Sequence, residues 1–74
     1  MHPWLTMDPF IVLSLANMKL RNFYHSLDAL CEDINIDKIV LIDKLYDIGY
    51  HYDEKGNHFI SNDLEEIETF KTQS

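Results

Sequence analysis

Two short apolar segments separated by only three residues constrain the fold of this chain more than any other feature. Residues 27–34 and 38–48 both carry apolar side chains at helical spacing, and Asn35, Ile36 and Asp37 lie between them. Because three residues leave room only for a tight turn, the two helices must meet at a corner. The sequence therefore predicts a helix-turn-helix outline.

Side chains that cap helices predict where each helix begins and ends. Asp8 and the proline after it predict a first helix over residues 9 to about 24, because aspartate caps free amides and proline suits the first helical position. Ser26 and Asp37 are the expected N-caps of the second and third helices. Gly49 is the expected left-handed residue after the third helix.

The second and third helices each show one apolar face at this spacing. The residues expected to be buried on them are Leu27, Leu30, Cys31, Ile34, Leu41, Leu45 and Ile48, with Val40 beside them.

The first helix is apolar around more of its circumference than one buried face requires. Its apolar residues fall on three stripes, whereas a surface helix needs a single stripe about 100° wide. The surplus predicts a central helix, one covered by other elements, or one that meets a second chain. With the aromatic N-terminus, the candidate interface consists of Trp4, Phe10, Ile11, Leu15 and Met18.

Residues 50–60 change to an alternating, aromatic-rich pattern around the letters DEKGN, which predicts a β-hairpin. Gly56 is expected to supply the positive φ of a type I turn with a bulge. Two registers stay open. One places Tyr50, Tyr52, His58 and Ile60 on the same face, and the other places Phe59 with the tyrosines.

The predicted fold class is mainly α with a small β-hairpin. It is a three-helix, helix-turn-helix or winged-helix-like domain followed by a short C-terminal helix. Residues 1–7 form an N-terminal arm, residues 8–60 a single domain, and residues 61–74 a short acidic helix with a frayed end. Asn62, with a glutamate three residues later, predicts a capping box at the start of that helix.

The formal net charge of −7 argues against binding to nucleic acid. Residues 26–49 alone carry six acidic residues and two lysines, on the segment that a helix-turn-helix would present to DNA. Lysine and arginine side chains that neutralise phosphates supply most of the non-specific affinity for DNA, and this acidic segment cannot make that contribution. The topology nevertheless keeps a winged-helix-like DNA-binding transcriptional regulator as the alternative function, ahead of a nucleic-acid mimic.

Asn17, Lys19 and Arg21 form a candidate polar strip within the first helix. The two cations could hold a carboxylate or a phosphate, with the amide adding hydrogen bonds. The competing interpretation is that Asn17 satisfies a nearby backbone group, while the cations balance the acids of the second and third helices.

Other reactive side chains are expected to be structural. The four histidines and Cys31 fit no compact ligand spacing, so neither a metal nor a cofactor is expected. Cys31 is expected to be a small buried apolar residue. Core and hairpin packing is expected for Tyr46, Tyr50, Tyr52 and Phe59. Since no nucleophile–base set is visible, no enzyme activity is expected and no catalytic residue is assigned.

The order and spacing of several short motifs resemble one known family. The motifs "DPF", "NMKLR", "SLDALCED", "IGY" and "NHF", within residues 8–60, resemble the bacterial family called domain of unknown function 4250. The resemblance implies a gut or anaerobic bacterial cytoplasmic protein, and it implies no activity and no catalytic residues.

These features predict a small acidic non-enzymatic protein-protein interaction module that associates with itself as a homodimer through its first helix. The N-terminus does not have the pattern of a signal peptide, and no apolar run is long enough to span a bilayer. A single cysteine suits a reducing compartment, so a cytoplasmic location is expected.

Overall fold

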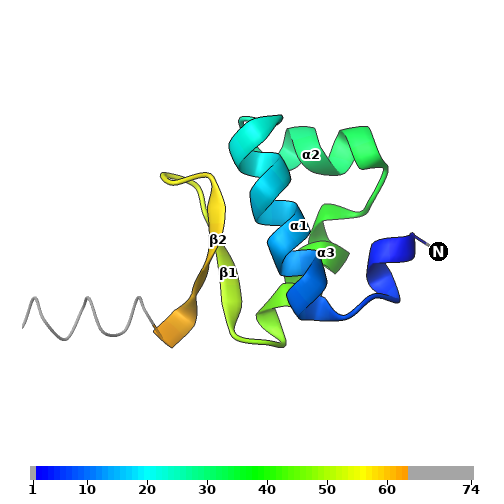
Figure 1. Cartoon of the computed structure of the whole chain (residues 1–74), viewed down its shortest axis with the longest axis vertical. Helices are drawn as coiled ribbons and strands as arrows, with labels where there is room; N and C mark the ends of the chain where they lie inside the picture. The colour runs from blue at the N-terminus through cyan, green and yellow to red at the C-terminus, as the bar shows by residue number, and fades with distance from the viewer. Residues whose placement is uncertain (1, 64–74) are drawn as a thin grey trace, which may run out of the picture.

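Three helices followed by a two-stranded antiparallel hairpin make up the chain in the computed structural model, which describes residues 2–63 (Figure 1). In chain order the elements are a 3₁₀ turn η1 (Pro3–Leu5), helices α1 (Pro9–Asn22), α2 (Leu27–Ile34) and α3 (Lys38–Tyr46), and strands β1 (Tyr50–Asp53) and β2 (His58–Ser61). This order confirms the predicted main class, three helices followed by a small β-hairpin. The predicted C-terminal helix falls largely on residues 64–74, outside the described residues.

The N-caps predicted for the first three helices are all confirmed. The Asp8 and Asp37 carboxylates each accept a hydrogen bond from the amide two residues further on, at 2.8 and 2.9 Å. The Ser26 hydroxyl accepts one from the amide three residues further on, at 3.1 Å. Each cap satisfies an amide that the first turn of its helix leaves free.

Two left-handed residues bring the chain out of α2 and α3. Asn35 has a φ of 59° at the C-cap of α2, a conformation that asparagine tolerates better than most residues. The next residue, Ile36, is buried and fixes the corner on the core. Gly49 takes a φ of 86° between α3 and β1, as predicted.

The hairpin takes the second of the two open registers. Tyr52 lies opposite Phe59, so Phe59 shares a face with the tyrosines and is buried. The prediction for Gly56 was wrong, because Asn57 is the loop residue with a positive φ, of 54°. A Cβ at position 56 would lie 2.4 Å from Nε2 of His58, so any other residue there would require the exposed His58 ring to move.

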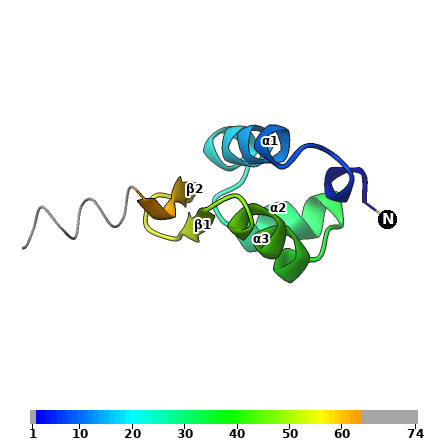
Figure 2. The same ribbon diagram turned by 90° about the horizontal axis from the view of Figure 1, so that it is seen from below.

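The helices form two layers around one core. Figure 2 shows α1 on one side of the domain and α2 with α3 on the other, and β2 packs against α1. The buried apolar residues are Trp4, Val12, Leu13, Ala16, Leu20, Leu27, Leu30, Cys31, Ile36, Leu41, Leu45 and Phe59. Every helix and the second strand therefore contribute to the same core.

Two residues of α3 depart from their predicted burial. Val40 is 41% exposed and Tyr46 is 62% exposed, although both were expected to pack inside. At 100° per residue, the fully buried Leu41 and Leu45 define the inner side of α3. Val40 and Tyr46 fall outside that narrow buried arc, one on each flank.

A pair of adjacent substitutions tests this assignment of the inner side of α3. We expect Leu41→Ala to lower the free energy of unfolding by about 2–5 kcal/mol, because it empties space in the core. Val40→Ala, its exposed neighbour, should change that free energy by about 0.5 kcal/mol or less. Urea unfolding followed by circular dichroism measures both. Equal losses at the two positions would show that the helix faces are assigned incorrectly.

Candidate functional site

The side of α1 that faces solvent carries most of the predicted interface. Phe10 and Ile11 are 57% and 53% exposed, and Met18 is 38% exposed. Together with the exposed Ser14 and Arg21 they lie within about 100° of the helix circumference. These five residues are called the α1 outer face below.

The other two candidate interface residues lie elsewhere. Trp4 is only 8% exposed and belongs to the core, where η1 places it, so it is not part of the exposed surface. Its indole ring meets the His2 ring edge-on, and His2 Nε2 lies 2.9 Å from the Ile34 carbonyl. Leu15 is half-buried against the core. The N-terminal arm is thus packed on the helices rather than held out to a partner.

Asn17, the first residue of the candidate polar strip, holds the hairpin in place. Its side-chain nitrogen donates to the Phe59 carbonyl at 3.1 Å, and its oxygen accepts from the Phe59 amide at 2.7 Å. Both backbone groups of one strand residue point to the same side, so the side-chain amide pairs with the open edge of β2 as a neighbouring strand would. Asn17 is therefore committed to a structural role.

A second asparagine joins the hairpin loop to the end of α1. The side-chain nitrogen of Asn57 donates to the carbonyls of Leu20 and Tyr24, at 3.1 and 2.9 Å. These carbonyls lie at the C-terminal end of α1, where helical acceptors lack partners within the helix. The Tyr52 hydroxyl in turn donates to the Asn57 oxygen at 2.5 Å.

The two cations of the polar strip do not act together. Lys19 places its ammonium 5.8 Å from the centroid of the Phe23 ring, whereas Arg21 is exposed on the α1 outer face. Residues two apart on a helix point to different sides. The structure therefore does not bring Asn17, Lys19 and Arg21 together as one anion-binding site.

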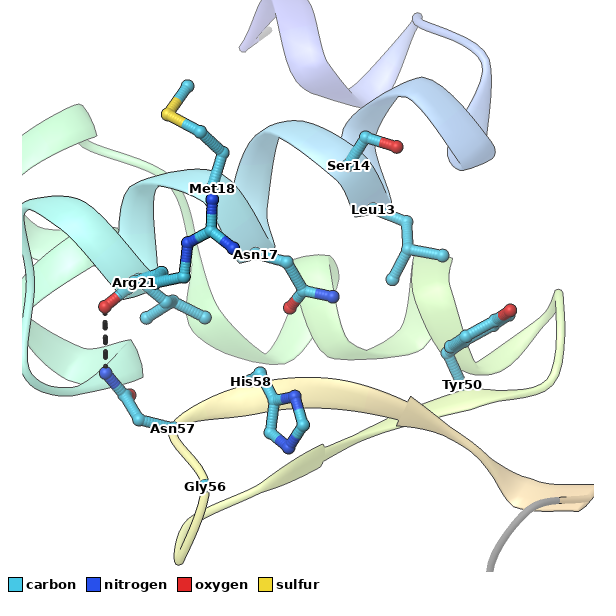
Figure 3. Close-up of a pocket in the computed structure, with 10 residues that line it drawn as sticks. Leu13, Ser14, Asn17, Met18, Arg21, Tyr50, Gly56, Asn57 and His58 are labelled. Atoms are coloured by element: carbon cyan, nitrogen blue, oxygen red, sulfur yellow. Dashed lines mark hydrogen bonds between the residues drawn. The ribbon is translucent and has the colours of Figure 1, made fainter.

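An open groove of about 750 Å³ lies between the exposed edges of α1 and the hairpin. Arg21 and Met18 lie along one edge of it and His58 along the other (Figure 3). Three of its polar residues are already engaged: Asn17 and Asn57 hold the hairpin, and His58 lies 3.5 Å from the Asp53 carboxylate. A catalytic site needs polar groups that are free to reach a substrate. The groove is better described as the seam where the hairpin docks.

Cys31 lies in the core as a free thiol. Burial, with a smaller contribution from the Asp28 carboxylate, raises the pKa of this thiol. Within residues 2–63, no group of three or more His, Cys, Asp or Glu side chains is arranged to hold a metal ion.

A second exposed apolar surface, which was not predicted from the sequence, lies on α3. Ile39 is 63% exposed, and with Val40, Tyr46 and the exposed carboxylates of Asp43 and Asp47 it forms what we call the α3 outer face. These five positions fall within about 120° of the helix circumference. The spacing of Ile39, Asp43 and Tyr46, four and three residues apart, was the signal that could have revealed it.

The fold and these surfaces define a small, mainly helical domain with a hairpin docked on its first helix. Residues 6–59 match the family described as Domain of unknown function (DUF4250), and the chain belongs to this family. No significant match was found among curated proteins or solved structures. None of the helices within residues 2–63 is long and apolar enough to cross a membrane.

Replacing Asn17 tests its structural role. We expect Asn17→Ala to lower the free energy of unfolding by about 1–3 kcal/mol, because it leaves both backbone groups of Phe59 without their partner. The amide of Phe59 should also exchange its hydrogen faster. Asn22→Ala is the matched control, since Asn22 lies on the same helix and is exposed. Hydrogen exchange that is unchanged at Phe59 would contradict the role.

The raised pKa of Cys31 predicts slow thiol chemistry. The folded chain should react with iodoacetamide more slowly than the urea-unfolded chain, and its rate should reach half-maximum at a higher pH, because the thiolate is the reactive form. By the same linkage, the stability that the protonated thiol contributes is lost as the pH rises through its raised pKa. Equal rates in the folded and unfolded chains would contradict burial of Cys31.

Proposed function

We propose that this domain is a non-enzymatic protein-protein interaction module of the bacterial cytoplasm that associates with itself through the α1 outer face. The observation that carries the proposal is the exposure of Phe10, Ile11 and Met18 side by side on one helix. Contiguous exposed apolar surface on a small domain typically marks an interface.

The energetics support association at this face. Covering apolar surface contributes roughly 25 cal/mol per Å², which makes large exposed side chains the strongest contributors available on this domain. Acids elsewhere on the surface keep the chain soluble, since the net charge is −7. A partner that covers Phe10, Ile11 and Met18 therefore gains affinity without displacing any residue of the core.

The non-enzymatic part of the proposal is supported by how the polar groups are used. Among the polar residues that line the groove, Asn17, Asn57 and His58 all have partners within the domain. The buried Cys31 thiol has a raised pKa, which suits a packing role rather than a nucleophile.

The alternative, a DNA-binding regulator, gains little support from the arrangement of charge. The α3 outer face, which a winged helix would insert into the major groove, presents Asp43 and Asp47 beside three large apolar side chains. Lys19 and Arg21 point to different sides of α1 and so do not form a joint phosphate-binding patch.

Sedimentation velocity over a wide range of protein concentrations tests the proposal. We expect the average mass to rise with concentration for the wild type, and Phe10→Ser to shift this rise to higher concentration because it removes apolar surface from the interface. Phe23→Ser is the matched control, since Phe23 is equally aromatic and 68% exposed but lies outside the α1 outer face.

Two results would contradict the proposal. One is a strictly monomeric wild type at every concentration reached. The other is an equal loss of association in the Phe10→Ser and Phe23→Ser variants, which would place the contact somewhere other than on the α1 outer face.

A further inference from the structure

We infer that the α1 outer face of one copy is covered by the α3 outer face of a second copy, so that the chains join head to tail. This inference rests on the proposed self-association and specifies its second surface. It is carried by the apolar content of both faces, by their opposite charges and by their positions on the domain.

The α3 outer face is acidic because the lysines of α3 are used elsewhere. The Lys38 ammonium lies 2.7 Å from the Asp28 carboxylate on α2, and Lys44 donates to the Leu5 carbonyl at 3.2 Å. Hydrogen bonding to Asp28 also raises the pKa of Lys38, which keeps that pair charged. What α3 presents to solvent is therefore an apolar surface with two carboxylates, Asp43 and Asp47.

The α1 outer face has the opposite character. Helix α1 contains no acidic residue at all, and its outer face carries one cation, Arg21, at the C-terminal end. No salt bridge to Arg21 is present within residues 2–63, so its guanidinium is available to a carboxylate of another chain. The two faces thus match in both apolar surface and charge, which favours their contact over contact between like faces.

Contact between two identical faces would cover less apolar surface and pair fewer opposite charges. Two α3 outer faces would bring four carboxylates together. Two antiparallel α1 outer faces offer Arg21 no carboxylate within the face itself, and one oxygen of the neighbouring Asp8 carboxylate already caps its own helix. Such a pair would also leave Ile39, Val40 and Tyr46 exposed, whereas contact between α1 and α3 covers both apolar surfaces.

The positions of the two faces permit this contact to repeat. Figure 2 shows α1 and α3 in opposite layers, so their outer sides point away from each other. A copy can therefore bind one neighbour through α1 and another through α3. Such a head-to-tail contact continues beyond the dimer unless a ring closes. Because it involves one helix face from each copy, it belongs with the small and weak class of interfaces, below about 1,200 Å².

Mixing two blocked variants tests the inference on the full chain. Ile11→Asp blocks the α1 outer face and Ile39→Asp blocks the α3 outer face, and both positions are more than half exposed, so the fold should tolerate the changes. We expect each variant alone to stay monomeric at concentrations where the wild type associates. An equimolar mixture should form a heterodimer that stops at two chains, because one intact α1 outer face meets one intact α3 outer face.

The outcomes separate the inference from the proposed function. If Ile39→Asp associates like the wild type while Ile11→Asp does not, the inference is overturned and self-association through α1 stands. If neither variant associates and the mixture forms no complex, the head-to-tail contact is overturned. If the wild type is monomeric throughout, the proposed function itself fails. Thermal unfolding of each variant confirms that the comparison is between folded chains.

A second experiment exchanges charges and leaves the apolar residues of both faces unchanged. Arg21→Glu should weaken association by at least about tenfold, because it places a carboxylate opposite Asp43 and Asp47 of the other copy. Adding Asp43→Arg to the same chain should restore it. Failure of the double variant to associate better than Arg21→Glu alone would count against contact between α1 and α3.

Discussion

The hydrogen bonds between the Asn17 side chain and the Phe59 backbone hold the hairpin on α1, and the remaining architecture depends on them. A two-stranded hairpin is marginal by itself in water, so it needs a surface to dock on. Asn17 supplies the polar part of that surface and the buried Phe59 ring supplies the apolar part. Asn57 then fixes the hairpin loop by donating to the carbonyls of Leu20 in the last turn of α1 and of Tyr24 just after it.

This use of the polar residues decides which surfaces remain for function. The amides that could have bound a ligand are committed to the hairpin, and Cys31 is committed to the core. Among residues 2–63, most of the large exposed apolar side chains gather on two helix faces, one on α1 and one on α3, which carry charge of opposite sign. Both lie on regular helices, and rigid elements of this kind hold an interface more exactly in place than loops do.

Local signals in the sequence were enough to predict the order of the elements. Asp8, Ser26 and Asp37 act through amides two or three residues away, so the helix starts could be read from short stretches of sequence. The register of the hairpin could not be predicted in this way, because the contact that selects it joins Asn17 and Phe59, which are 42 positions apart. Gly56 was assigned the positive φ because glycine adopts it most easily, whereas the loop residue that takes it is Asn57, whose side chain is held by hydrogen bonds to Leu20 and Tyr24.

The candidate site was predicted only in part for the same physical reason. A surplus of apolar residues on α1 could be counted, but which of them face solvent depends on what packs against the helix. That is why Phe10, Ile11 and Met18 are exposed whereas Val12 and Ala16 on the same helix are buried. On α3, the role of the lysines depends on partners on other elements, and only the structure shows Lys38 and Lys44 turned away from the outer face.

The most direct test of the central claim is the concentration dependence of the backbone amide signals in ¹⁵N-labelled full-length protein. The account predicts that signals move for residues of the α1 outer face, such as Ile11 and Met18, while those of Phe23 and the hairpin loop stay constant. Signals that are unchanged on the α1 outer face, or changes centred on the hairpin loop, would contradict it.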